Sequence, residues 1–234
     1  MLANRTKGES SFLLLVFWLI FPALATWSSF TLQWWPQVLY PLSKVVLVVA
    51  PLLFWCRNGW SLSTILKRAG VVRSNGIIGV VSGAVFAGII WFAWLFCFQG
   101  QLEGGNIAAK LTSLNLIEHY WSVAIFMALA NSLLEEWYWR GFVYDQLVQR
   151  ALSRPAIVAL GGAGFGLHHY FTLIVYFPLS VTLFFTFTTM IAGGAWTVMR
   201  LKRVSLVDCY VSHIVADFAL LWIGWQLLGG THGI

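Results

Sequence analysis

The sequence predicts an all-α fold, a polytopic transmembrane bundle of about seven helices. Of the 234 residues, 59% are hydrophobic and only 9% are charged. Long apolar stretches recur along the chain, and basic residues collect in the turns between them. This composition is typical of a membrane protein and not of a soluble globule. We find no internal repeat and no soluble domain, so we expect a single membrane-embedded domain over residues 1–234.

Seven apolar stretches are long enough to cross a hydrocarbon core of about 30 Å, which takes ~20 helical residues. The fifth of them is short. The connection 57–75 has room for a short amphipathic helix around LSTILKRAGVV. In chain order the predicted stretches are 12–33, 38–56, 76–98, 120–150, 155–170, 174–199 and 205–228.

The first stretch has two interpretations. Its basic start, the apolar run from Phe12 and the segment Ala23-Leu24-Ala25, with small residues at both ends, resemble a signal peptide that is cleaved after residue 25. The stretch continues to Trp34 and Trp35, however, and such an aromatic anchor is typical of a retained first helix. We expect retention, with cleavage of residues 1–25 as the alternative.

The basic residues predict the topology. The net charge is +6, from 14 Lys and Arg against 8 Asp and Glu. The positive-inside rule then places the N-terminus in the cytoplasm and the C-terminus outside. No basic run is interleaved with exposed aromatic residues, so we expect no nucleic-acid partner. The residues that define the cytoplasmic side are Arg5, Lys7, Arg57, Lys67, Arg68, Arg73, Arg150, Arg154, Arg200, Lys202 and Arg203.

Polar residues inside the apolar stretches are costly there, so each is a candidate functional residue. Lys44, in PLSKVVLVV, lies roughly 20 Å along a helix from Arg57. We expect Lys44 to have a structural role, either pairing with a neighbouring helix or extending toward the interface. The other candidates are Asn131, Glu135, Glu136, Arg140, His168, His169, His213 and Asp217.

The stretch LLEEWYWRGF places two adjacent carboxylates and an arginine inside the fourth apolar stretch. Residues four apart share a helical face, whereas adjacent residues differ by ~100°. Arg140 can therefore neutralise Glu136, while Glu135 points toward the face of Asn131 and Trp139. A carboxylate without a paired cation in a poorly solvated site is suited to act as a general base. We predict Glu135 as the base and Glu136 as a structural partner; the alternative is that both only join helices.

Two further pairs have the same spacing. His213 and Asp217 lie four apart in YVSHIVADF, and Phe165 and His169 lie four apart in GAGFGLHHYF. Each pair therefore occupies one helical face. Taken alone, either pair is more typical of packing or helix pairing than of catalysis.

The depths of the three candidate side chains are similar. At ~1.5 Å per residue, Glu135 and His169 each lie roughly 22 Å from the nearest predicted cytoplasmic arginine, and His213 lies about 15 Å from it. The three side chains are thus expected to meet in the outer half of the membrane. This requires the fourth helix to continue past Arg140 toward Arg150.

The segments EEWYWR, FGLHH and HIVAD resemble the motifs EExxxR, FxxxH and HxxxN/D of the CPBP family. This family comprises CAAX-protease and bacteriocin-processing enzymes, also called Abi-type intramembrane glutamic proteases. Each motif alone is weak. Together, in the order of the family and each within an apolar stretch, they are specific, and they cover residues 135–217 within the region 120–228. The first three predicted helices match nothing beyond general hydrophobicity.

The resemblance implies an intramembrane endopeptidase, a hydrolase that cleaves a membrane-associated or lipid-anchored substrate. Glu135 and His169 would activate the water that attacks the scissile carbonyl, and Glu136 with Arg140 would support the site. The chemistry is physically plausible, because a base needs a partner to position water and the tetrahedral oxyanion needs a donor. We predict no cofactor and no metal.

The resemblance places His213 and Asp217 at the oxyanion end of the site. An asparagine at position 217 would donate a hydrogen bond to an oxyanion, whereas an ionised Asp217 can only accept one. Asp217 therefore either orients His213 or is protonated. His168 lies ~100° from His169 on the helix, and only His169 has phenylalanine four residues before it, so we predict His168 as a packing or interfacial residue.

The resemblance also implies the partners, a protein or peptide substrate at the membrane and membrane lipid. It allows C-terminal cleavage of prenylated proteins, maturation of bacterial peptides or trimming of membrane-anchored proteins, and the sequence does not choose among them. The short chain is similar to prokaryotic members, which implies a multi-pass protein of the plasma (inner) membrane.

One other mechanism and two other classes of function stay open. Glu and two His are zinc ligands in many hydrolases, so a metal-dependent version of the same protease is one alternative. Membrane-embedded Glu, His and Asp also form proton relays in transporters, although no paired halves or inverted repeat is evident here. A catalytically silent membrane scaffold is the third alternative.

Overall fold

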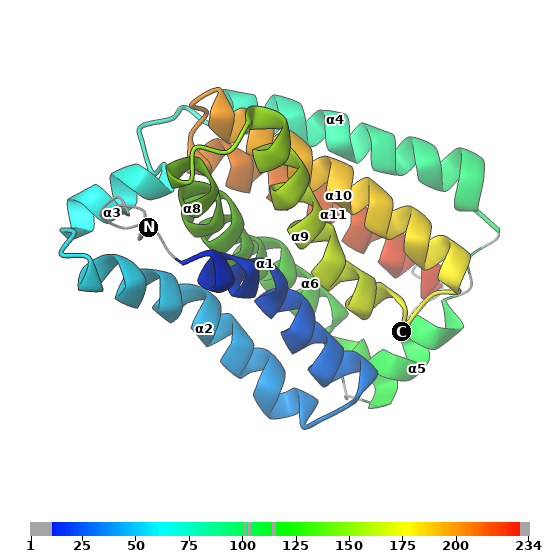
Figure 1. Cartoon of the computed structure of the whole chain (residues 1–234). Coiled ribbons are helices and arrows are strands. Elements are labelled where there is room, and N and C mark those ends of the chain that lie inside the picture. Colours follow the sequence, from blue (N-terminus) through cyan, green and yellow to red (C-terminus); the bar gives the residue numbers. More distant parts are fainter. Residues whose placement is uncertain (1–10, 101, 103, 114–115, 230–234) are drawn as a thin grey trace. The chain divides into compact units, whose positions relative to one another are not determined.

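Figure 1 shows the computed structural model, which describes residues 11–100, 102, 104–113 and 116–229. Throughout these residues the regular structure is helical, without strands, and this confirms the predicted all-α class. Arg5 and Lys7, on which part of the signal-peptide alternative depends, lie outside the described residues.

The chain divides into two compact units, which we describe separately. Unit 1 comprises Met1–Arg73 and Leu134–Leu206. The expectation of a single domain over 1–234 stays a prediction. The helical elements of unit 1 are α1 (Phe12–Thr26) with its π-helical extension η1 (Trp27–Thr31), α2 (Pro36–Arg57), α3 (Leu62–Ala69), η5 (Trp137–Val143), α8 (Tyr144–Gln149), α9 (Arg154–Leu173) and α10 (Leu179–Leu201).

Unit 2 comprises Ser74–Leu133 and Val207–Ile234. The short helix α7 (Ser132–Glu136) contains one boundary between the two units, and another follows Leu206, the first residue of α11. The helical elements of unit 2 are α4 (Ile77–Ala93) with its π-helical extension η2 (Trp94–Phe98), α5 (Gly105–Ser113), η3 (Ile117–His119), α6 (Tyr120–Phe126), η4 (Met127–Asn131) and α11 (Leu206–Leu227).

Local sequence signals define the ends of several helices. Ser61 and Ser153 cap α3 and α9, each accepting a hydrogen bond from a backbone N–H three residues later, as serine does at helix starts. Gly70 ends α3 with φ of +87°, a left-handed conformation that glycine adopts without strain. The amphipathic helix expected within 57–75 is therefore present as α3.

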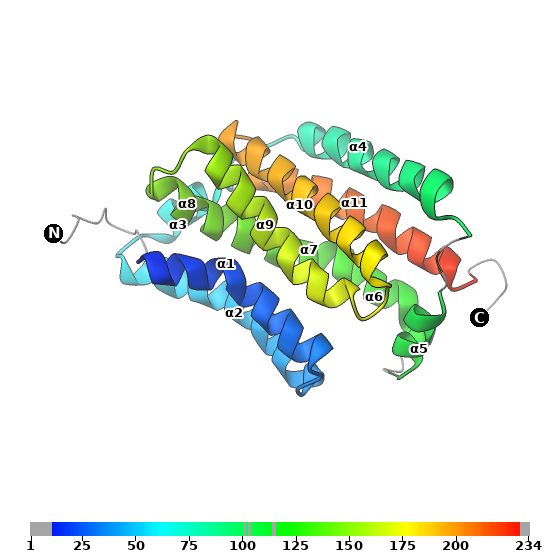
Figure 2. The same cartoon turned by 45° about the vertical axis from the view of Figure 1, so that its right-hand side comes forward.

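Close packing of α9 against α10 forms the centre of unit 1. The two helices lie side by side, with α1 on α9 and α2 beside α1 (Figures 1 and 2). Gly162 of α9 permits this approach, because a Cβ there would lie 2.6 Å from the carbonyl oxygen of Met190. Small residues at such contacts let two backbones come close in a membrane. Thr26 of α1 also donates a hydrogen bond to the carbonyl of His168, 3.1 Å away.

In unit 2, α4 packs along α11 (Figure 2). Added Cβ atoms at Gly79 and Gly83 would meet the backbone of α11 at about Asp208 and Ser212. The carboxylate of Asp208 accepts hydrogen bonds from the backbone N–H of Gly79, at 3.2 Å, and from the hydroxyl of Ser74. This carboxylate satisfies one of the free N–H groups in the first turn of α4.

Within the part of the chain that the structure describes, five of the predicted stretches form helices that are long and apolar enough to cross a membrane. They are Phe12–Thr31, Pro36–Arg57, Ile77–Phe98, Leu179–Leu201 and Leu206–Leu227. Many large apolar side chains on them are exposed, as lipid-facing residues are. The chain is therefore a multi-pass membrane protein.

The count of seven spans is not confirmed. The predicted stretch 120–150 is a continuous helical run from α6 to α8, but it contains the two π-helical segments η4 and η5. The predicted stretch 155–170 lies within α9, whose glycines and two histidines lower its hydropathy. As expected, the helix continues past Arg140, and it ends at Gln149.

We predict that Gly162→Ala destabilises the protein by about 1–3 kcal/mol, because the new methyl group overpacks the α9–α10 contact. Gly88→Ala is the matched control, since a Cβ there has no atom within 4 Å. The control should melt at or slightly above the wild-type temperature, as alanine favours helices. Thermal unfolding in detergent checks both, and equal melting of Gly162→Ala and wild type would contradict the packing argument.

Candidate active site

The two adjacent glutamates of α7 have different partners. The Glu136 carboxylate lies 3.0 Å from Nη1 of Arg140, one helical turn later, and both side chains are fully buried. A buried ion pair is stable only when both charges are well compensated, because each loses its hydration. Glu136 and Arg140 therefore form a sealed pair inside unit 1.

Aromatic rings surround the other side of Arg140. Its guanidinium carbon lies 4.2 Å from the ring centroid of Phe165 and 4.9 Å from that of Trp196. It also donates a hydrogen bond to the carbonyl of Gly193, 3.2 Å away. Rings on both α9 and α10 thus hold the guanidinium by cation–π contact. Phe165, which begins the FxxxH pattern, connects the second motif to the arginine of the first.

Glu135 is paired with a cation, contrary to the expectation from the sequence. Nζ of Lys44 on α2 lies 3.2 Å from Oε1 of Glu135. The Glu135 side chain is only 4% exposed and that of Lys44 16%. The helical-face argument considered charges on the same helix, whereas this cation comes from a helix about 90 residues earlier in the chain.

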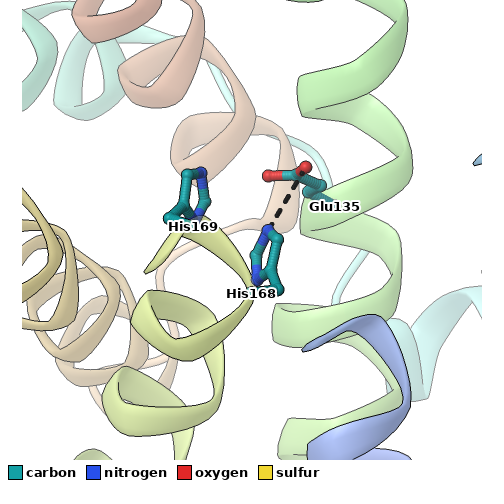
Figure 3. Close-up of side chains that lie close together, drawn as sticks. All are labelled: Glu135, His168 and His169. Carbon is teal, nitrogen blue, oxygen red and sulfur yellow. Dashed lines mark ion pairs between the residues drawn. The ribbon is translucent and has the colours of Figure 1, made fainter. Parts of the chain in front are cut away.

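Figure 3 shows that His168 and His169 both lie beside Glu135. Nε2 of His168 is 3.5 Å from Oε1 of Glu135, and the buried His168 ring stacks on Trp139 with centroids 5.7 Å apart. One ring nitrogen of His169, Nδ1, is hydrogen-bonded to the Phe165 carbonyl at 2.8 Å. A bond at Nδ1 fixes the orientation of the ring.

The sequence argument left His168 out of the site because adjacent residues differ by ~100° around a helix. The structure places it there because the two imidazole rings lie close together, with centroids 4.1 Å apart, so that both come near the Glu135 carboxylate. Ligand atoms of Glu135, His168 and His169 all lie within 4.8 Å of one another. An adjacent pair of histidines in one apolar stretch was the available signal for this arrangement.

A small cavity adjoins Glu135. Its walls include Lys44, Tyr40, Trp139 and His168. Its volume of about 10 Å³ leaves room for roughly one water molecule, with a carboxylate, an ammonium and an imidazole as polar neighbours. Glu136, sealed against Arg140, is not part of its wall. The cavity therefore distinguishes the two glutamates chemically.

The same cluster has the donor set of a metal site. One carboxylate and two imidazoles are ligands that Zn²⁺ accepts. Lys44, however, places an ammonium 3.2 Å from Oε1 of this carboxylate. A second cation at the same carboxylate would be repelled by it, because like charges at such distances interact strongly in an apolar medium. The cluster is better suited to an ammonium than to a divalent cation.

The third motif lies in unit 2, on α11. Nε2 of His213 is 3.6 Å from Oδ1 of Asp217, and Ser132 donates a hydrogen bond of 2.5 Å to Oδ2 of Asp217. His213 is buried and Asp217 is half-buried. Ser132 was absent from the sequence prediction, since a serine in an apolar helix carries no distinctive pattern. The predicted meeting of His213 with the Glu135 cluster stays a prediction.

Comparison with known proteins gives one family match. The model of the family described as type II CAAX prenyl endopeptidase Rce1-like matches residues 117–219. This segment contains EEWYWR, FGLHH and HIVAD, and Lys44 lies outside it. No curated protein and no solved structure matches the chain.

We predict that Arg140→Gln destabilises the protein by ~3–5 kcal/mol, because it leaves Glu136 buried without its cation. The double variant Glu136→Gln with Arg140→Gln should recover part of this loss. The exposed Arg57→Gln is the matched control and should change stability by less than about 0.5 kcal/mol. Melting in detergent measures all four proteins, and a wild-type melting temperature for Arg140→Gln would refute the sealed pair.

Proposed function

We propose that this protein, whose residues 117–219 match the Rce1-like family of type II CAAX prenyl endopeptidases among the CPBP proteases, cleaves its substrate with a water activated by Glu135. The match supports an intramembrane hydrolase whose substrate is a membrane-associated protein. The observation that carries the mechanism is the cavity of one-water size beside Glu135.

In the proposed reaction the Glu135 carboxylate accepts a proton from the water, and the water oxygen attacks the scissile carbonyl carbon. The electron pair of the carbonyl moves to its oxygen, which becomes the oxyanion. When this intermediate collapses, the C–N bond breaks and the proton passes to the leaving amine nitrogen. His169 positions the water in this scheme. His168 is a second candidate, because it lines the cavity and its Nε2 lies 3.5 Å from Oε1 of Glu135.

We assign the third motif to the oxyanion. His213 would donate a hydrogen bond to it, and Asp217 would hold the His213 ring in the required orientation. The hydrogen bond from Ser132 supports this division, since a carboxylate oxygen that accepts from a hydroxyl is suited to the ionised form. Asp217 therefore acts through His213 in this proposal and not as a direct donor.

We further propose a location in a prokaryotic plasma membrane, with the N-terminus in the cytoplasm and the C-terminus outside. The support is the set of basic residues that flank the predicted cytoplasmic ends of the helices. The proposed partners are a protein or peptide substrate, whether prenylated or not, and the surrounding lipid. Nucleic acid has no role in this proposal.

Of the alternatives, the metal-dependent protease has an observation in its favour, the grouping of Glu135, His168 and His169. The Lys44 ammonium weighs against it. Proton-coupled transport and a silent scaffold have no comparable support from the described residues.

The first test is quantitative terminomics on membranes from cells that make wild type or Glu135→Gln at equal levels. New protein termini should appear with the wild type and be lost with Glu135→Gln. The matched control is Glu118→Gln, a change at an exposed glutamate that should leave these termini unchanged. Identical termini in wild-type and Glu135→Gln membranes, together with different ion or solute flux, would favour transport over proteolysis.

The second test concerns the metal. Protein purified in EDTA should contain substoichiometric zinc by elemental analysis and should retain its activity, because the carboxylate in the cluster is already paired with Lys44. Activity that disappears in EDTA and returns with Zn²⁺ would establish the metal-dependent mechanism instead.

A further inference from the structure

We propose that Lys44 is a positioning residue of the hydrolytic site, whose ammonium group holds Glu135 as a carboxylate directed at the water-sized cavity. This inference rests on the proposed function of Glu135 as the base. Lys44 belongs to α2, outside the segment 117–219 that matches the family, so none of the three motifs contains it.

The position of Lys44 within α2 is unusual for a lysine. The helix has 22 residues and is long and apolar enough to cross a membrane. Lys44 lies well inside it, 13 residues before Arg57 at its end. A lysine at such a depth is costly unless it has a partner or a path to the interface. Its side chain instead points to Glu135 and is mostly buried.

Lys44 contacts Glu135 and faces the same cavity. Nζ lies 3.2 Å from Oε1 of Glu135 and 4.9 Å from the centroid of the Tyr40 ring. Tyr40 is one helical turn before Lys44, so its ring supports the ammonium from the same helix. The three side chains all line the cavity. Lys44 thus fixes the carboxylate at the cavity wall.

The other groups that face Glu135 within unit 1 are weaker sources of positive charge. From α9 these are His168 and His169, which are cationic only when protonated. From α1 the wall carries Pro22 and Thr26, which are uncharged, and from η5 it carries Trp139. Among these neighbours, Lys44 is the one whose side chain is already an ammonium cation at neutral pH.

The physical role of the ammonium follows from the surroundings of Glu135. An isolated carboxylate in an apolar site takes up a proton to avoid the loss of hydration. A protonated Glu135 cannot accept a proton from water. The nearby ammonium offsets the lost hydration and maintains the basic form. When Glu135 takes the proton from water, the attraction between Glu135 and Lys44 falls. The attraction returns when the proton leaves with the amine product.

The test is the pH dependence of kcat/KM for Lys44→Met and Lys44→Arg. The probe is a fluorogenic peptide copied from a cleavage site that the terminomics identifies. Without the cation, Glu135 is protonated at higher pH, so the acid limb of the Lys44→Met profile should move to higher pH. Activity at pH 7 should fall about tenfold or more and recover in large part at pH 9. Lys44→Arg should retain the wild-type profile.

Lys67→Met is the control, because Lys67 is an exposed lysine of α3. It should leave the profile unchanged. A Lys44→Met profile that falls by the same factor at every pH would overturn the inference and leave Lys44 a purely structural role. Equal activity of Lys44→Met and wild type at all pH values would overturn it as well.

A stability measurement separates this inference from the proposed function. The melting temperatures of Lys44→Met, Glu135→Gln and the double variant form a double-mutant cycle that needs no substrate. Lys44→Met should be the least stable, and the double variant should recover part of the loss. Strictly additive effects would refute the Lys44–Glu135 pair itself. If the pair couples but wild type shows no cleavage that depends on Glu135, the proposed function fails and not the pairing.

Discussion

Two adjacent carboxylates buried in an apolar bundle each need a cation, and this requirement organises unit 1. Glu136 takes Arg140 from the next helical turn, whereas Glu135 takes Lys44 from α2. The cost of an unpaired buried charge is several kcal/mol, so neither pair can be lost cheaply. One glutamate thereby makes its ion pair within one helical turn, and the other makes its ion pair with a helix that is distant in the sequence.

Close helix packing makes these pairs possible. Gly162 lets α9 approach α10 closely, and Phe165 of α9 and Trp196 of α10 then provide the rings that face Arg140. Thr26 fixes α1 to the backbone of His168. The π-helical segment η5 follows directly after the glutamates and includes Trp139, on which His168 stacks. Such segments are frequent at functional sites.

The same packing gives the two glutamates unequal surroundings. Glu136 is enclosed by its arginine, which suits a structural pair. Glu135 borders a cavity together with an ammonium and an imidazole, which suits proton transfer with a bound water. A difference of one position along a helix thus separates a supporting charge from a candidate base. In unit 2, Ser132 and His213 share Asp217 in a comparable division of roles.

The sequence alone was enough for the all-α class, five of the apolar spans, the contact between Glu136 and Arg140 and the resemblance to the family that matches residues 117–219. These depend on composition, on helical spacing and on local motifs. It could not supply the cation of Glu135. Many residues separate Lys44 from Glu135, and an apolar helix does not specify which neighbour it meets.

The spacing rule also set His168 apart from His169, although the two rings lie only 4.1 Å apart and both come near the Glu135 carboxylate. Helical periodicity describes where side chains leave the backbone, whereas contacts depend on how helices pack. The tertiary structure of unit 1 therefore decided the neighbours of Glu135, because only the packing of α2 and α9 against α7 brings an ammonium and two imidazoles to one carboxylate.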